Sequence, residues 1–165
     1  MTQAVFEEVK GFLQLLGDEI KSEFKEQETW EIHIKRGDFI VSVRQSNKTP
    51  FIEVIFPSPF KDDALLKRLD RFLDTPSHMA RLLSYLTSPD NSFNIIKEND
   101  DFAGFNVMAK VFPEDGEYRI KDLDHGIRSA ISAGALGFMY IQLCVSEVPV
   151  AQKIVHEDIV DRMFQ

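Results

Sequence analysis

Three side chains of this sequence, His33, Arg44 and Glu53, have types and positions that could form an acid–base or ligand-binding site. Each occupies a polar position in a segment where polar and apolar residues alternate, so we expect all three on the outer face of one sheet. A histidine that shares a pocket with a carboxylate can transfer a proton if the pocket excludes water. The sequence therefore admits an enzyme or small-ligand binder with its site on the outer face of the first three strands. An open, flat surface there would argue against it.

Motifs of known chemistry are otherwise missing from the sequence. It contains no phosphate-binding glycine loop, no metal-ligand pair at helical spacing and no Gly-x-Ser-x-Gly turn. Asp122, Asp124 and His125 form the densest polar cluster, and acids near the start of a helix are best explained by the helix dipole. Cys144 lacks a basic neighbour that would lower its pKa, and we interpret it as a small buried hydrophobe. We therefore predict no catalytic residue, no cofactor and no metal site.

The formal charge of −8 and the pI near 5.0 limit the partners of this chain. Nucleic acid and anionic membrane surfaces both require a basic face, so we predict that the chain binds neither. A single cysteine cannot form an internal disulfide, and the N-terminal residues lack the basic and apolar regions of a signal peptide. We predict a cytoplasmic protein whose partner carries basic or apolar segments.

Alternation of polar and apolar residues predicts an antiparallel meander of three strands. The strands cover residues 30–35, 39–44 and 51–56. The tripeptide Arg36-Gly37-Asp38 turns the chain between the first two strands, because glycine tolerates a positive φ. The third strand is apolar on both faces, and we expect it to end at Pro57-Ser58-Pro59.

Apolar residues at helical spacing predict helices before and after this meander. They cover residues 5–16, 62–74 and 78–86, and a last long helix starts near Ile120. Segments 93–97 and 105–112 predict a hairpin between the third and fourth helices. The first helix either ends near Gly17 or continues to Lys25, and the sequence leaves this open.

Strands that are grouped together, rather than alternating with helices, indicate an α+β fold. We predict an antiparallel sheet of about five strands, a meander plus a hairpin, packed against helices. The predicted order is helix, three strands, two helices, two strands, helix and a C-terminal tail helix. Residues 1–165 should form a single domain, with 149–165 as a tail that either detaches or forms an interface.

The last long helix contains a run without charge, from Ser129 to Val145, in a chain that is 28% charged. A helix that lacks a charged stripe is covered on more than one side. The length and polar content of the run argue against a membrane span. We expect its large residues to face the sheet, namely Ile127, Ile131, Phe138 and Ile141.

The other positions of this helix are candidates for an interface. Small residues recur three or four positions apart and permit close approach of another backbone, either that of the chain's own sheet or that of a second subunit. The exposed apolar positions need a second cover, which is either the tail helix or another subunit. The candidate interface residues are Gly126, Ala130, Gly134, Leu136, Gly137, Met139, Leu143, Ile159 and Met163.

With this order of elements, small size and acidity, the chain resembles the type III secretion chaperone-like proteins over roughly residues 5–145. The resemblance implies a homodimer that holds a segment of a client protein. We therefore predict a non-enzymatic protein-binding or chaperone-like module that acts as a homodimer. The alternatives are an enzyme or ligand binder, as above, and a structural subunit of a larger complex.

Overall fold

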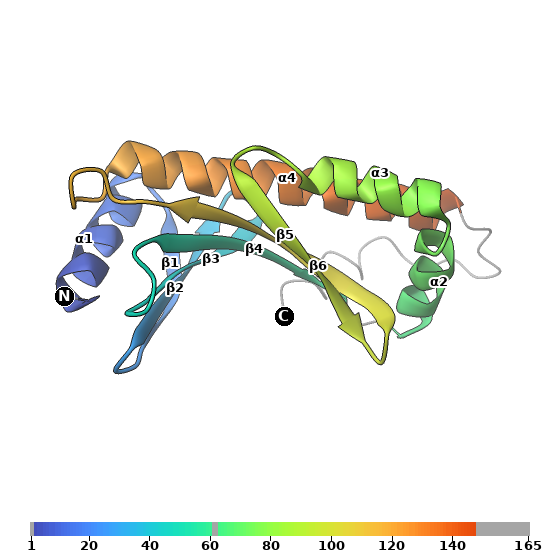
Figure 1. Ribbon diagram of the computed structural model, residues 1–165, viewed down its shortest axis with the longest axis horizontal. Helices are drawn as coiled ribbons and strands as arrows, with labels where there is room; N and C mark the ends of the chain where they lie inside the picture. Colours follow the sequence, from blue (N-terminus) through green and yellow to red (C-terminus); the bar gives the residue numbers. More distant parts are fainter. Residues whose placement is uncertain (1, 61–62, 148–165) are drawn as a thin grey trace. The chain divides into compact units, whose positions relative to one another are not determined.

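The computed structural model describes residues 2–60 and 63–147, which form four helices and six strands (Figure 1). They follow one another as α1 (Thr2–Leu15), β1 (Glu19–Lys25), β2 (Thr29–Arg36), β3 (Phe39–Ser46), β4 (Ile52–Pro59), α2 (Asp63–Leu73), α3 (Pro76–Leu86), β5 (Asn91–Glu98), β6 (Asp101–Val111) and α4 (Ile120–Glu147). The chain divides into two compact units. The first comprises residues up to Pro57 and Met108–Ser132, and the second comprises Ser58–Val107 and the chain from Ala133 on.

The predicted fold class is confirmed. The strands form one antiparallel sheet in the order β1-β2-β3-β4-β6-β5. The predicted meander corresponds to β2, β3 and β4, and the predicted hairpin to β5 and β6. This hairpin turns at Asn99 and Asp100, which both have positive φ, as a tight two-residue hairpin turn requires. The predicted tail, with Ile159 and Met163, lies outside the described residues.

The sequence did not reveal β1, which makes the sheet one strand wider than predicted. Helix α1 ends because Gly17 takes a φ of +81°, while Asp18 N–H donates to Leu13 O at 3.0 Å and Gly17 N–H donates to Gln14 O at 3.1 Å. This pair of bonds is the Schellman motif, which closes a helix and turns the chain away. The chain then pairs antiparallel with β2, with Ile20 opposite Ile34.

The segment Pro57-Ser58-Pro59, which was predicted to end the third strand, forms the last part of β4, and the strand ends at Pro59. Pro57 and Pro59 are exposed, and Ser58 between them is fully buried. Proline is compatible with a strand wherever the ladder does not need its N–H group. In the second unit, the main chain of Ser58 closely approaches Gly104 of β6.

In the first unit, α1 packs on β1 and β2. The rings of Phe6 and Trp30 meet edge to face, with 5.7 Å between their centroids. An ion pair joins Lys10 Nζ to Glu23 Oε1 at 2.7 Å. The inner sides of β2, β3 and β4 supply the buried core of this unit, which contains Trp30, Ile32, Ile34, Val41, Val43, Ile52 and Val54.

In the second unit, α3 runs beside the C-terminal part of α4 (Figure 1). The rings of Tyr85 and Tyr140 pack together with 5.5 Å between their centroids. A Cβ on Gly137 would overlap the side chain of Leu86 and lie 3.0 Å from the Phe105 ring. The small residue at this position is therefore needed for packing within the unit.

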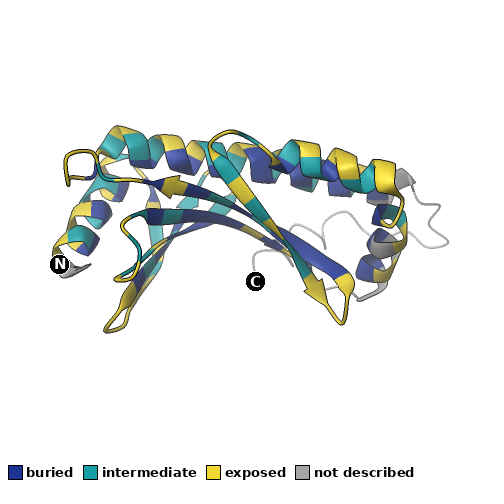
Figure 2. Ribbon diagram, viewed as in Figure 1, coloured by how far each residue is buried: buried dark blue, intermediate teal, exposed yellow. Residues whose placement is uncertain are grey.

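The predicted large-residue stripe of α4 is buried most completely at its ends. Ile127 is 0% exposed and Ile141 is 1% exposed, whereas Ile131 and Phe138 are half-buried. Helix α4 is also long and apolar enough to cross a membrane by length and composition alone, a test that the core helix of a soluble protein passes as well. Of the most apolar segment of this helix, within Ile120–Cys144, 44% is buried inside the fold. Figure 2 shows buried and exposed residues alternating along α4.

Candidate functional site

The register of strands β1 to β4 places two rows of mostly polar side chains on the outer face of the first unit. In an antiparallel sheet, residues directly opposite one another on the same face are neighbours. The first row contains Ser22, His33 and Ser42. The second row contains Phe24, Glu31, Arg44 and Glu53.

His33 and Glu31 form the centre of a hydrogen-bonded network. His33 Nε2 lies 2.9 Å from Glu31 Oε1, and Ser22 Oγ lies 3.0 Å from His33 Nδ1. Ser42 Oγ donates a short hydrogen bond to the same Glu31 oxygen. With the ring proton on Nε2, His33 donates to Glu31 and accepts from Ser22, so every contact has both a donor and an acceptor.

The carboxylate of Glu31 is held in its charged form. Burial acts to raise the pKa of Glu31, but the hydrogen bonds from Ser42 and His33 outweigh it and lower that pKa below the ordinary value. The nearby charge of Arg44 acts in the same direction. Glu31 therefore presents a fixed negative charge on the outer face of the sheet at neutral pH.

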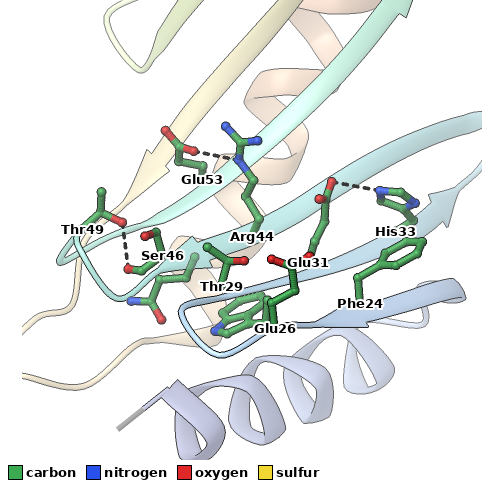
Figure 3. A pocket seen from close by; sticks show the side chains of 11 residues that line it. Phe24, Glu26, Thr29, Glu31, His33, Arg44, Ser46, Thr49 and Glu53 are labelled. Atoms are coloured by element: carbon green, nitrogen blue, oxygen red, sulfur yellow. Dashed lines mark hydrogen bonds and ion pairs between the residues drawn. The ribbon is translucent and has the colours of Figure 1, made fainter.

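A pocket of about 550 Å³ lies over these rows (Figure 3). Phe24 forms part of its wall and meets the His33 ring edge to face, with 5.3 Å between centroids. The pocket is lined by Phe24, Glu26, Thr29, Trp30, Glu31, His33, Arg44, Gln45, Ser46, Thr49 and Glu53. The three residues singled out in the sequence, His33, Arg44 and Glu53, thus line one hollow and not a flat surface.

The sequence assigned no partner to His33, Arg44 or Glu53, and the structure shows which side chain each one contacts. The carboxylate beside His33 is Glu31, two residues earlier on the same strand, and Glu53 instead accepts from Arg44 Nε at 2.9 Å. The sequence did contain the signal, because residues i and i+2 of a strand share a face. A hydroxyl, an imidazole and a carboxylate in series also occur in catalytic triads. Here Ser22 is the cross-strand neighbour of His33.

The first unit also contains a buried ion cluster that the sequence did not reveal. Arg36 donates from Nε and Nη2 to the two carboxylate oxygens of Asp18, both at 2.6 Å, and from Nη1 to Asp124 at 2.6 Å. The Asp18 side chain is only 1% exposed. Asp124 therefore has a role beyond its favourable interaction with the helix dipole. Its Oδ1 accepts from Arg36, and its Oδ2 accepts from Arg128 Nε at 2.8 Å. This cluster joins the turn after β2 to the end of α1 and to α4.

The described residues contain no group of three or more metal-binding side chains that could hold an ion. Cys144 is buried in the second unit, as predicted. Its neighbour Tyr140 is 8% exposed, and its hydroxyl lies 3.2 Å from His78 Nδ1. These groups form part of the packing between α3 and α4.

Tyr140 is expected to ionise far above the ordinary range. Burial raises the pKa of Tyr140 to about 12, and Cys144 adds to the shift. The unfolded chain loses this proton at about 10, so the contribution of Tyr140 to stability should be constant below that pH and be lost as the pH rises to about 12. Alkaline titration of tyrosinate absorbance should show a step near 12 that Tyr140→Phe removes. If Tyr140→Phe instead removed a titration step near pH 10, the raised pKa of Tyr140 would be contradicted.

The predicted interface residues of α4 separate into two groups. Gly126, Ala130, Gly134 and Gly137 are all buried, and a Cβ on Gly126 would lie 2.8 Å from a Val111 methyl of its own unit. The second group faces solvent: Leu136, Met139 and Leu143 are 49%, 58% and 58% exposed. Small residues thus pack α4 on its own fold, and large apolar residues lie on its outer side.

Comparison with family models and with curated proteins gives no match for this chain. Among solved structures, an uncharacterized protein from Methanothermobacter thermautotrophicus is similar, with a TM-score of 0.68 and 12% identity over 83% of this chain and 96% of that one. YbjN from E. coli, described as "a putative transcription regulator", has a TM-score of 0.50 and 10% identity over 86% of this chain and 93% of its own. At such identities the likeness shows a shared fold alone.

Proposed function

We propose that this chain is a non-enzymatic protein-binding module of the chaperone-like kind that acts as a homodimer, with α4 as its dimer surface. One observation carries the proposal. Leu136, Met139 and Leu143 are large apolar residues of α4 that are about half exposed. They lie three and four residues apart, so they form a single stripe along one side of the helix.

Burial of this stripe would stabilise an association. Complete burial of a leucine or methionine side chain contributes roughly 1.5–3 kcal/mol of free energy. Because these side chains are about half exposed, an interface could contribute about half of that value for each of them. Two copies related by a twofold axis would place the same stripe against itself. The three side chains would then form the apolar centre of an interface whose rim comes from neighbouring positions of the helix.

Charge favours a second copy as the occupant of this surface. Each chain has a formal charge of −8, so two copies repel one another over most of their surfaces. The run from Ser129 to Val145 contains no charged residue. Two copies can therefore approach there without bringing like charges together.

The resemblance to the type III secretion chaperone-like proteins supports a dimeric protein-binding function, because the resemblance implies a homodimer that holds a segment of a client protein. The fold shared with the archaeal protein supports the architecture only. A dimeric binding module agrees with the description of YbjN as "a putative transcription regulator". A second candidate, ligand binding in the first unit, is favoured by the pocket that brings His33 against Glu31.

Substitution of Leu136 by aspartate is expected to split the dimer, weakening association by at least about 100-fold, because a charge would have to lose its water at the interface. Sedimentation velocity at about 10 µM should then show a single 19.0 kDa chain. Leu15→Asp is the matched control, since Leu15 is 79% exposed at the end of another helix and its loss should leave the dimer intact. If Leu136→Asp instead lowered the free energy of unfolding by several kcal/mol without changing the mass, α4 would be covered within one chain.

A further inference from the structure

Leu136, Met139 and Leu143 form a row on α4 that reads the same from either end. A methionine lies at its centre, and a leucine lies about one helical turn away on each side. All three side chains are about half exposed, at 49%, 58% and 58%. Two copies of such a row can lie against each other in two ways, with the helices parallel or antiparallel.

The antiparallel arrangement matches the row to itself end for end. Leu136 of one copy then packs on Leu143 of the partner subunit, and Met139 meets Met139 of the partner subunit at the twofold axis. A methionine suits this axis, because its unbranched and flexible side chain can adapt to a copy of itself. The parallel arrangement would also bury the three side chains, so apolar contact alone does not decide between the two.

Positive charge further along α4 and the helix dipole both favour the antiparallel arrangement. Arg128 lies close to three helical turns before Met139, so both are on the same side of the helix, and the Arg128 side chain is 73% exposed. Its partner Asp124 is shared with Arg36, so Asp124 offsets the charge of Arg128 only in part. Parallel copies would place the two Arg128 side chains together and would align the helix dipoles. In antiparallel copies centred on the row, the arginines lie about 35 Å apart along the axis.

We propose that two copies of α4 cross antiparallel, with Met139 at the twofold axis and Leu136 packed on Leu143 of the partner subunit. This arrangement rests on the proposed homodimer and adds to it the orientation and the register of the two helices. A shift of the register by one helical turn would leave one leucine of each copy outside the apolar contact. The row therefore fits a second copy of this chain in one defined position.

The two orientations give the same positions different neighbours. In the antiparallel crossing, Leu136 faces Leu143 of the partner subunit, and each leucine lies about 10 Å along the axis from its own copy. In the parallel alternative, each leucine faces its own copy, and Leu136 lies about 10 Å along the axis from Leu143 of the partner subunit. Met139 faces its own copy in both. A disulfide requires two Cα atoms within about 7 Å, so disulfide formation distinguishes the orientations.

Cysteine substitution at these exposed positions measures the arrangement in the full chain. Chains with Leu136→Cys and chains with Leu143→Cys, one kind carrying a tag, are mixed, allowed to exchange subunits and oxidised. We expect the mixed disulfide to form at least about tenfold faster than either like pair, and Met139→Cys to crosslink with itself. The unaltered protein is the control, because its Cys144 is 1% exposed and should form no disulfide between chains. Unfolding curves should confirm that each variant folds.

The crosslinks and the mass together separate the orientation from the dimer itself. Like pairs that form as fast as the mixed pair, or faster, would overturn the antiparallel crossing and leave a dimer through α4 standing. A dimer by mass that crosslinks at none of the three positions would overturn the crossing and move the interface away from α4. A mass of one chain without crosslinks would overturn the crossing together with the proposed homodimer.

Discussion

Replacement of Gly104 by alanine should lower the free energy of unfolding by more than about 3 kcal/mol, the largest effect we expect from a single methyl group. Gly104 has a φ of +142°, which residues with a Cβ rarely adopt. A Cβ there would overlap the carbonyl oxygen of Ser58 and lie 2.9 Å from Pro59 Cα. Both contacts are with main chain, so no side chain can rotate away. The two strand segments would have to separate around the fully buried Ser58.

Two other glycines provide matched controls for this result in urea unfolding. Gly116 also has a positive φ, +87°, but a Cβ there would have no atom within 4 Å, so alanine should cost only about 1–2 kcal/mol. Gly11 lies inside α1 with open space around it, and alanine should stabilise the protein by about 0.5–1 kcal/mol. Equal effects of Gly104→Ala and Gly116→Ala would show that the close approach to Ser58 is unimportant.

Replacement of Arg36 by methionine should lower the free energy of unfolding by about 3–5 kcal/mol, because it leaves a buried charge without its partner. Asp18 has a side chain that is 1% exposed and receives two hydrogen bonds from Arg36. Lysine at position 36 should recover only part of the loss, since an ammonium cannot donate to both oxygens in the same plane. The pKa of Arg36 is raised chiefly by the bond to Asp18, so the guanidinium stays charged at any pH of the test.

A double variant distinguishes charge from packing at this cluster. Arg36→Met combined with Asp18→Leu removes both members of the pair and should recover most of the lost stability. Arg128→Met is the surface control: its partner is also Asp124, but its side chain is 73% exposed, so the change should be below about 0.5 kcal/mol. If Arg36→Met behaved like Arg128→Met, the cluster would contribute nothing to the fold.

Local pattern predicted most of the fold because the helices and the meander repeat their periods clearly. It missed β1 because Ile20 and Phe24 are four residues apart and fit a helix as well as a strand. Only the glycine at position 17, with its left-handed conformation, separates the two alternatives. The continuation of β4 through two prolines was missed for a different reason, since the effect of proline depends on which N–H groups the sheet needs.

In the candidate site, too, local pattern predicted some features, and contacts between distant residues decided the others. Alternation placed His33, Arg44 and Glu53 on one outer face, which requires only strand geometry. Their hydrogen-bond partners depend on register, and register is set by pairing between strands. The cluster of Asp18, Arg36 and Asp124 spans 106 positions of sequence, a separation for which a single sequence carries no signal. The sequence indicated that Leu136, Met139 and Leu143 lie away from the sheet, because a sheet can cover only one side of an apolar helix.

We propose that two copies of this chain associate through the exposed stripe of α4. Light scattering coupled to size-exclusion chromatography, from about 5 to 100 µM, measures this most directly. We predict a mass of twice 19.0 kDa across that range for the unaltered protein. A mass of one chain, 19.0 kDa, at the highest concentration would contradict the account.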